Sequence, residues 1–181
     1  MALQLPQDLQ FDFDPKLLLE VKFPQPSGAP VYIKAGQNYP VNQKIPSFGV
    51  LFRPLEILRF GPGPYVVIAV DYDAPVGVRE VRHFIGGGFW FGGIDADGVL
   101  PLVNTTRAVS EWVAPQPPAG EPAHRYTFLL YKESPGFRTQ TIITPDTPGL
   151  PIGFNLSTFA AATGLGYPLG GTFAFVATPA S

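Results

Sequence analysis

Residues 65–70 of the chain read YVVIAV and lie between the turn-forming residues 61–64 (GPGP) and an acidic segment that begins at Asp71. A run this short, rich in β-branched residues and apolar at every position, is typical of a strand buried on both faces in the middle of a sheet. Asp71 and Asp73 follow directly, so rigid structure would hold their carboxylates. The sequence therefore predicts a central strand with acidic groups at its carboxyl end.

A second strand is predicted over residues 124–131 (HRYTFLLY). Side chains alternate between the two faces of a strand, so His124 and Tyr126 would share one face and Arg125 the other. Both faces carry apolar residues, which indicates that this part of the sheet is also buried on both sides. Arg125 would suit a structural ion pair with Asp73.

The remaining elements are predicted to be short. Residues 82–85 and 172–177 read as strands, and the first fifty residues as loops with edge strands. Residues 51–60 contain a proline and are expected to form an interrupted strand or an irregular segment. One helix is expected over residues 156–163, capped by Asn155 and ended by a glycine.

The composition supports a packed β protein. The chain has 22 prolines and 20 glycines, but 45% of its residues are hydrophobic and only 14% are charged, which excludes a disordered chain. The prediction is a mostly β fold, an antiparallel β-sandwich with one or two small helices. A single domain is expected over residues 1–181, since this length is enough for one stable core.

Several classes of protein are excluded by what the sequence lacks. There is no cysteine, so disulfides, thiolate metal sites and a cysteine nucleophile are ruled out. The 12 basic and 14 acidic residues are scattered, which argues against nucleic-acid binding. No stretch approaches the ~20 apolar residues of a transmembrane helix, and residues 1–15 lack a secretory pattern, so a cytoplasmic protein is expected. The oligomeric state is left open.

The chain has only two histidines, His83 and His124, each in or at the start of a predicted strand. If these strands neighbour the one that ends at Asp71, two imidazoles and a carboxylate would meet. Three functions fit this set: a metal site, a general acid or base, or a phosphate-binding site. No metal is predicted, because the sequence does not establish the spacing that a metal triad needs. No cofactor is predicted, because the glycine-rich segments lack the dinucleotide and P-loop patterns.

Three blocks of sequence together resemble the phosphatidylethanolamine-binding protein family. They are residues 71–75 (DYDAP), residues 79–84 (REVRHF), and residues 112–131, which run from Trp112 through PPAG to HRYTFLLY. Their order and spacing agree with the family pattern of D-P-D-A-P, a histidine-bearing strand and a P-P-x-G block before H-R-Y-x-F-x-L-Y. The resemblance extends to residues 154–175, which match the family's later helix and strand.

The resemblance implies a β-sandwich with a small anion pocket at strand ends, which takes phosphate, acetate or a phospholipid head group. Carried over residue by residue, the pocket positions are Asp71, His83, His124 and Tyr126. Trp112 lies beside them in the motif, and Pro75 matches a proline that follows a cis peptide bond in the family. Asp71 beside an imidazole would favour its charged form and so improve anion capture.

This sequence also departs from the family pattern. Val81 and Phe84 stand where the family has tryptophans, and Ala114 and Gln116 replace glycines of the pocket loop. These changes weaken the inference of phosphate binding, since bare backbone is what lets a loop approach an anion. Residues 86–93 (GGGFWFGG) are expected to form an altered, more apolar pocket rim. The chain ends soon after its last strand, so the C-terminal helix of some family members is expected to be absent.

Two functions follow as hypotheses. The first is a protein that binds a small anionic or amphipathic ligand and regulates a protein partner such as a kinase or a protease. The second is an enzyme of specialised metabolism (an isomerase, a cyclase or a condensation catalyst) in which His83 or His124 is the general acid or base. Whether the chain is an enzyme is left open by its sequence.

Overall fold

The structure is a computed structural model that describes residues 15–41, 44–75, 77, 80–146 and 152–179. Residues 1–14, for which the sequence predicts no secretory pattern, and residue 79 of the second family block lie outside the described residues. All helices within the described ranges are too short to reach across a membrane.

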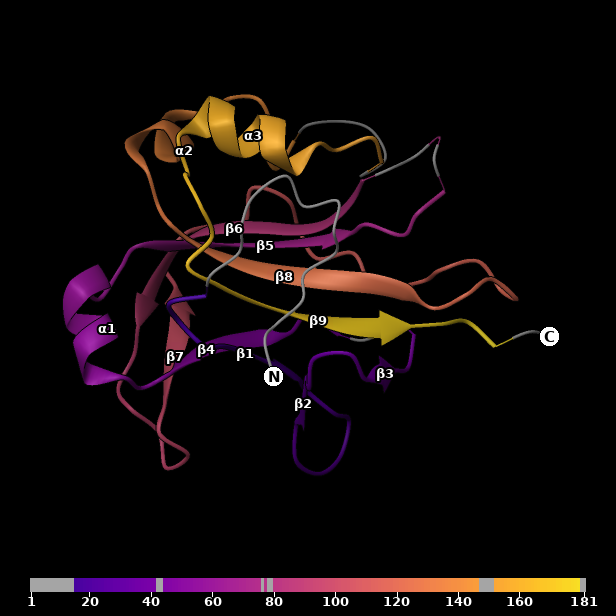
Figure 1. Cartoon of the computed structure of the whole chain (residues 1–181), viewed down its shortest axis with the longest axis horizontal. Helices are drawn as coiled ribbons and strands as arrows, with labels where there is room; N and C mark the ends of the chain where they lie inside the picture. Colours follow the sequence, from indigo (N-terminus) through magenta and orange to yellow (C-terminus); the bar gives the residue numbers. More distant parts are fainter. Residues whose placement is uncertain (1–14, 42–43, 76, 78–79, 147–151, 180–181) are drawn as a thin grey trace.

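Among the described residues, nine strands form one curled sheet in the order β2-β1-β4-β7-β6-β5-β8-β9-β3 (Figure 1). Their bounds are β1 Leu19–Phe23, β2 Val31–Tyr32, β3 Asn38–Tyr39, β4 Ser47–Leu51, β5 Tyr65–Asp71, β6 Val81–Phe91, β7 Val99–Asn104, β8 His124–Lys132 and β9 Gly170–Val176. The fold is mostly β, as predicted, but the sheet is mixed, because β3 pairs with β9 in parallel while the other pairs are antiparallel.

Strand β7 joins the two layers of the fold. Its first half pairs with β4 and its second half with β6, so the sheet bends around this strand. The bend lays β1 and β4 over the inner face of β5 and β8, and Val21, Val50, Val67 and Phe128 meet there in an inner core. The result is a sandwich whose layers are continuous through one strand.

The predicted central strand is confirmed. All seven residues of β5 are buried, and β5 lies between β6 and β8. The alternation predicted for residues 124–131 is also confirmed, since Tyr126 and Phe128 enter the inner core, whereas Leu129 and Tyr131 enter a second, outer core under two helices. Burial on both faces explains why this part of the sequence is apolar at successive positions.

Strand β6 is longer than predicted. The strand expected over residues 82–85 continues through the glycines to Phe91. Two irregularities in its pairing with β5 absorb extra residues, one between Arg82 and Phe84 and one at Gly87 and Gly88. Gly88 has φ of 65°, a left-handed conformation that suits glycine in a bulge. Local propensity alone does not reveal these bulges, because they depend on the partner strand.

In the part of the chain that the structure describes, three short helices complete the fold: α1 Pro54–Phe60, α2 Pro135–Thr139 and α3 Leu156–Thr163. Helix α3 confirms the prediction, with the Asn155 side chain accepting a hydrogen bond from the Thr158 N–H at 2.7 Å. Helices α2 and α3 cover the outer face of the sheet (Figure 1). The prediction for residues 51–60 was wrong. Pro54 begins α1, because proline at the first helical position loses no hydrogen bond.

The corner after β5 is held by the ion pair predicted from the sequence. Asp73 accepts hydrogen bonds from the Arg125 guanidinium at 2.7 Å (Nε) and 2.6 Å (Nη2), and from the Arg125 backbone N–H at 2.8 Å. Burial opposes ionisation of Asp73, but these hydrogen bonds and the positive charge of Arg125 outweigh it and lower the pKa of Asp73 below its ordinary 3.8. A lowered pKa means that the ionised carboxylate stabilises the folded state.

We expect Asp73→Asn to lower the free energy of unfolding by about 2 kcal/mol near neutral pH, because the charged hydrogen bonds to Arg125 are weakened. The difference in free energy of unfolding between wild type and Asp73→Asn is present above the pKa that Asp73 has in the unfolded chain. It is lost as pH falls through the lower pKa that Asp73 has in the folded protein. Denaturant titrations from about pH 7 to about pH 3 measure both effects. The control Asp146→Asn, at a carboxylate that is 90% exposed, should change little. A constant difference between Asp73→Asn and wild type down to the lowest pH would contradict the assignment.

Candidate functional site

Asp71, His83, His124 and Tyr126 come together at one end of the sheet. Asp71 ends β5 and pairs with Tyr126 of β8 on one side and with Val81 of β6 on the other. All four side chains are on the inner face, and no more than 5% of each residue is exposed. The structure therefore brings together four of the six site residues predicted from the sequence.

A bulge in β6 is what turns His83 toward the other three residues. Val70 pairs with Arg82 and Ala69 with Phe84, so His83 is an extra residue between two paired positions. With strict alternation, His83 and Phe84 would point to opposite faces. The bulge lets both point inward, and the His83 ring lies edge-on to the Tyr126 ring with 4.8 Å between ring centroids.

Asp71 orients the ring of His124. The Asp71 Oδ2 accepts a hydrogen bond from His124 Nδ1 at 2.8 Å, and Asp71 Oδ1 accepts one from the Asp73 N–H at 2.9 Å. Because the carboxylate accepts, the hydrogen-bond network places a proton on Nδ1 of His124. The other ring nitrogen, Nε2, is then the atom of His124 that can exchange a proton or bind a ligand.

His83 is held by the backbone of the pocket loop. Its Nδ1 donates a hydrogen bond to the carbonyl oxygen of Val113 at 2.7 Å, which leaves Nε2 without a proton in the neutral ring. Burial lowers the pKa of His83 below 6.5, although the Val113 carbonyl and the charge of Asp71 oppose this effect. The charge of Asp71 favours the charged imidazole of His83, as expected, but desolvation outweighs this attraction and the net pKa of His83 falls.

Tyr126 remains protonated over the whole physiological range. Burial raises the pKa of its hydroxyl first, and the negative charge and hydrogen bonding of Asp71 raise it further. A backbone hydrogen bond from Gln116 partly opposes this rise. Tyr126 therefore cannot act as a base, and its single hydroxyl proton is directed to the Asp71 carboxylate.

One residue at the site was missed by the sequence reasoning. Glu121 lies three positions before His124, and its Oε2 is 3.5 Å from His124 Nε2. The Glu121 side chain is 45% exposed, so it links the buried imidazole to the solvent. The spacing in the sequence was visible, but the proline-rich loop gives no periodicity from which the contact could be predicted.

The remaining two predicted residues differ in their outcome. Trp112 is partly buried beside the cluster, with its ring 6.4 Å from the His83 ring and stacked on Phe128 at 6.2 Å. Pro75 is exposed, and the cis peptide bond among the described residues precedes Pro64, not Pro75. The prediction of a cis bond at Pro75 is therefore corrected.

The aromatic segment expected at the pocket rim lies elsewhere. Trp90 is seven positions beyond His83 on β6, about 20 Å along an extended strand. Phe89 packs into the inner core with Phe48, and Phe91 packs on Tyr65. Residues 86–93 therefore do not form the rim of the histidine cluster, because the strand carries them to its opposite end.

No group of three or more His, Asp or Glu side chains in the described part of the chain could hold a metal ion. In the cluster itself, one nitrogen of each imidazole already makes a hydrogen bond. Nδ1 of His124 bonds Asp71, and Nδ1 of His83 bonds the Val113 carbonyl. The arrangement offers hydrogen-bonding and proton-exchanging groups rather than a ligand set.

The lowered pKa of His83 predicts a loss of stability on mild acidification. The unfolded histidine binds a proton near pH 6.5, whereas the folded one does so only at lower pH, so stability falls as pH drops through this window. In His83→Asn, whose amide can still donate to the Val113 carbonyl, the loss between about pH 7 and about pH 5 should be smaller. Thermal unfolding of both proteins, measured across this pH range, checks this prediction. An equal loss of stability in wild type and His83→Asn would contradict the assignment of this effect to His83. Asp73 does not contribute to it, because the pKa of Asp73 lies below this pH window.

Comparisons with known proteins give one family and one fold. A family model described as phosphatidylethanolamine-binding protein matches residues 54–174, which is more than half of the chain. A search of curated proteins returned no match.

Among the solved structures that are similar to the chain, two illustrate the shared fold. The crystal structure of carboxypeptidase Y inhibitor complexed with the cognate proteinase is 22% identical, with a TM-score of 0.65 over 92% of this chain and 85% of that chain. The solution structure of CG7054 is 21% identical, with a TM-score of 0.58 over 93% of this chain and 88% of that chain. These identities support the fold alone, whereas the family model together with the sequence blocks assigns the family. The chain belongs to the phosphatidylethanolamine-binding protein family.

Proposed function

We propose that the chain binds a small anion or the anionic part of a phospholipid head group at the cluster of Asp71, His83, His124 and Tyr126. The observation that carries this proposal is the convergence of these four buried side chains from β5, β6 and β8. Buried polar groups are costly unless they are satisfied, and two imidazoles and a phenol gathered at strand ends are a costly arrangement to keep for packing alone.

Each group would have a distinct task in anion binding. Tyr126 keeps its proton and hydrogen-bonds Asp71, so it adds no negative charge and helps to hold this carboxylate in place. His124 presents Nε2 toward the loop that carries Glu121 and would reach the ligand there. His83 is the group that gains charge as pH falls, because burial lowers its pKa in the free protein. Anion binding would therefore be coupled to proton uptake at His83.

This coupling predicts that anion affinity rises on mild acidification. Sulfate is a suitable probe because its charge stays constant between about pH 8 and about pH 5, so a change in affinity reports the protein. Calorimetric titration should give tighter binding to wild type at the lower pH and a much smaller pH dependence in His83→Ala. The double variant His83→Ala/His124→Ala should lose at least tenfold in affinity. Equal binding by wild type and the double variant, or no binding by either, would remove the proposal.

Glu121 sets a second expectation for the same site. Its carboxylate, 3.5 Å from His124 Nε2, occupies the side from which an anion would approach. Like charges disfavour a common site, so Glu121→Gln should bind sulfate several-fold more tightly than wild type. A weaker or unchanged affinity would show that the anion does not enter beside Glu121. Glycerophosphoethanolamine, titrated in parallel, distinguishes a head-group site from a site for free anions.

We also infer a protein partner, such as a protease or a kinase. The support is that a protein of this fold, the carboxypeptidase Y inhibitor, was solved in complex with its cognate proteinase. Adding the purified chain to a serine carboxypeptidase and measuring residual activity tests the protease form of this inference. Undiminished activity at a large molar excess of the chain would count against it.

A catalytic role for the same cluster is the second candidate. The observation in its favour is the buried hydrogen bond between Asp71 and His124, which orients the ring and leaves Nε2 to exchange a proton. Mass spectrometry of molecules that copurify with the chain separates the two functions. A retained anion or phospholipid supports binding, whereas an apolar metabolite that is altered during incubation with wild type but not with His124→Ala supports catalysis.

A further inference from the structure

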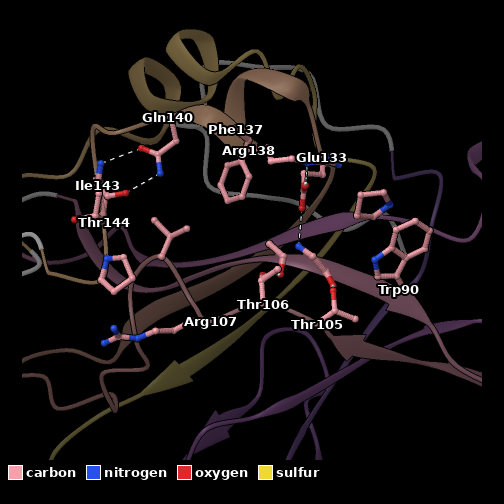
Figure 2. A pocket seen from close by; sticks show the side chains of 15 residues that line it. Trp90, Thr105, Thr106, Arg107, Glu133, Phe137, Arg138, Gln140, Ile143 and Thr144 are labelled. Atoms are coloured by element: carbon pink, nitrogen blue, oxygen red, sulfur yellow. Dashed lines mark hydrogen bonds and ion pairs between the residues drawn. The ribbon is translucent and has the colours of Figure 1, made fainter.

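A cavity of about 500 Å³ lies at the second bulge of β6, at the opposite end of this strand from His83 (Figure 2). Its walls include Gly87 and Gly88 of the bulge, Thr105 and Thr106 after β7, and Glu133 after β8. Neither the histidine cluster nor the family motifs contribute to it. The kind of ligand that the cavity can bind depends on which of these groups have unused hydrogen-bond donors or acceptors.

Glu133 places a buried carboxylate in this wall. Its side chain is 6% exposed, and its Oε2 accepts a hydrogen bond from the Gly88 N–H at 2.6 Å. A Cβ on Gly87 would come within 2.9 Å of Oε2 and overlap the ring of Phe137, so a side chain there would displace the carboxylate. Oε1 accepts from Arg138 Nε at 3.1 Å. A carboxylate can accept about four hydrogen bonds, so these two contacts leave capacity for a donor.

The two threonines also present acceptors to the cavity. Thr105 donates its hydroxyl proton to the Gly88 carbonyl at 2.9 Å, and Thr106 donates its own to the Gly87 carbonyl at 3.0 Å. A hydroxyl has one proton, so each oxygen has only lone pairs left for a ligand. Gln140, farther along the wall, is oriented by the backbone of Ile143, to which it donates one hydrogen bond and from which it accepts another. The bulge end of the cavity is therefore rich in acceptors and would match a molecule that brings donors.

Lys132 and Arg107 are engaged away from this end of the cavity, whereas Arg138 forms an ion pair with Glu133. Lys132 directs its ammonium to the carbonyls of Phe60 and Gly63, both at 2.9 Å. Arg107, at the far end, lies 3.4 Å from Glu111 and 3.9 Å from Asp146. Arg138 makes one hydrogen bond to Glu133 and its side chain is 67% exposed, so its guanidinium can move into water when another cation takes its place at the buried carboxylate.

We propose that this cavity is a second ligand site, which binds an organic cation that carries an ammonium or guanidinium group. Glu133 pairs with the positive charge in place of Arg138, and the hydroxyls of Thr105 and Thr106 accept the remaining N–H groups. Trp90, which is 40% exposed and stands at the edge of the cavity, offers an aromatic surface to the same cation (Figure 2). The cation can be a free amine or the basic side chain of a peptide, since both carry the same chemistry.

Agmatine and an acetylated, amidated Gly-Arg-Gly peptide are suitable probes for the two sources. Calorimetric titration of the full chain gives their affinities, with sodium sulfate as the opposite-charge comparison. The chain has two tryptophans, so Trp112→Phe leaves Trp90 as the single reporter, and its fluorescence should change as agmatine binds. Binding of agmatine alone identifies a small-amine site, and binding of both probes identifies a site open to peptides.

Two variants with opposite expected effects test the charge logic. Glu133→Gln should weaken agmatine binding at least tenfold, and its amide oxygen can still accept from Gly88. Arg138→Gln should strengthen binding several-fold, because it removes the chain's own competing guanidinium. Glu20→Gln removes a carboxylate from β1 and serves as the matched control. Thermal unfolding of each variant without ligand identifies any loss of folding, and Arg138→Gln, at an exposed position, keeps the test decisive if Glu133→Gln is unstable.

Three results with the cations would overturn the proposal: no binding of either cation to wild type, equal agmatine affinity in wild type and folded Glu133→Gln, or weaker agmatine binding in Arg138→Gln. Sulfate binding that is lost in Arg138→Gln would instead assign the cavity to anions and overturn it as well. Because none of these measurements uses His83 or His124, failure here leaves the proposed function of the histidine cluster unaffected.

Discussion

The turn after β5 makes two contacts with β8 on which the histidine cluster depends. Asp71 hydrogen-bonds the His124 ring at 2.8 Å on the inner side of the sheet, while Asp73 forms a two-pronged ion pair with Arg125, the next residue along β8. Successive residues of a strand point to opposite faces, so the two aspartates bind side chains on opposite faces of β8. These two contacts orient His124 and also fix the carboxyl end of the central strand.

The two bulges of β6 divide this strand into two chemically different ends. The first adds His83 to the inner face, where burial keeps the imidazole neutral near pH 7. The second exposes the backbone groups of Gly87 and Gly88 to Glu133, Thr105 and Thr106. A bulge changes which way a side chain or a peptide group points without breaking the sheet. One strand can therefore serve a histidine cluster at one end and an acceptor-rich cavity at the other.

Much of the fold could be predicted because burial leaves a direct trace in the sequence. Strands β5 and β8 were predicted from apolar runs, and α3 from Asn155 and Gly164 at its ends. Helix α1 could not be predicted from the sequence, because Pro54 is compatible with a helix start as well as with an interrupted strand. The full length of β6 was missed because glycines carry no propensity for a strand, and only pairing with β5 and β7 holds them there.

For the site, the sequence alone determined which groups were available: two histidines, the Asp71–Asp73 pair and Tyr126, in an order and spacing that matched a family. Tertiary structure decided how they act. It placed Glu121 beside His124 and moved the aromatic segment of residues 86–93 away from the cluster. It also set the pKa of His83 by burial rather than by the charge of Asp71. The physical reason is that residue identity fixes chemistry and strand pattern, whereas desolvation, bulges and loop contacts depend on neighbours that are distant in the chain.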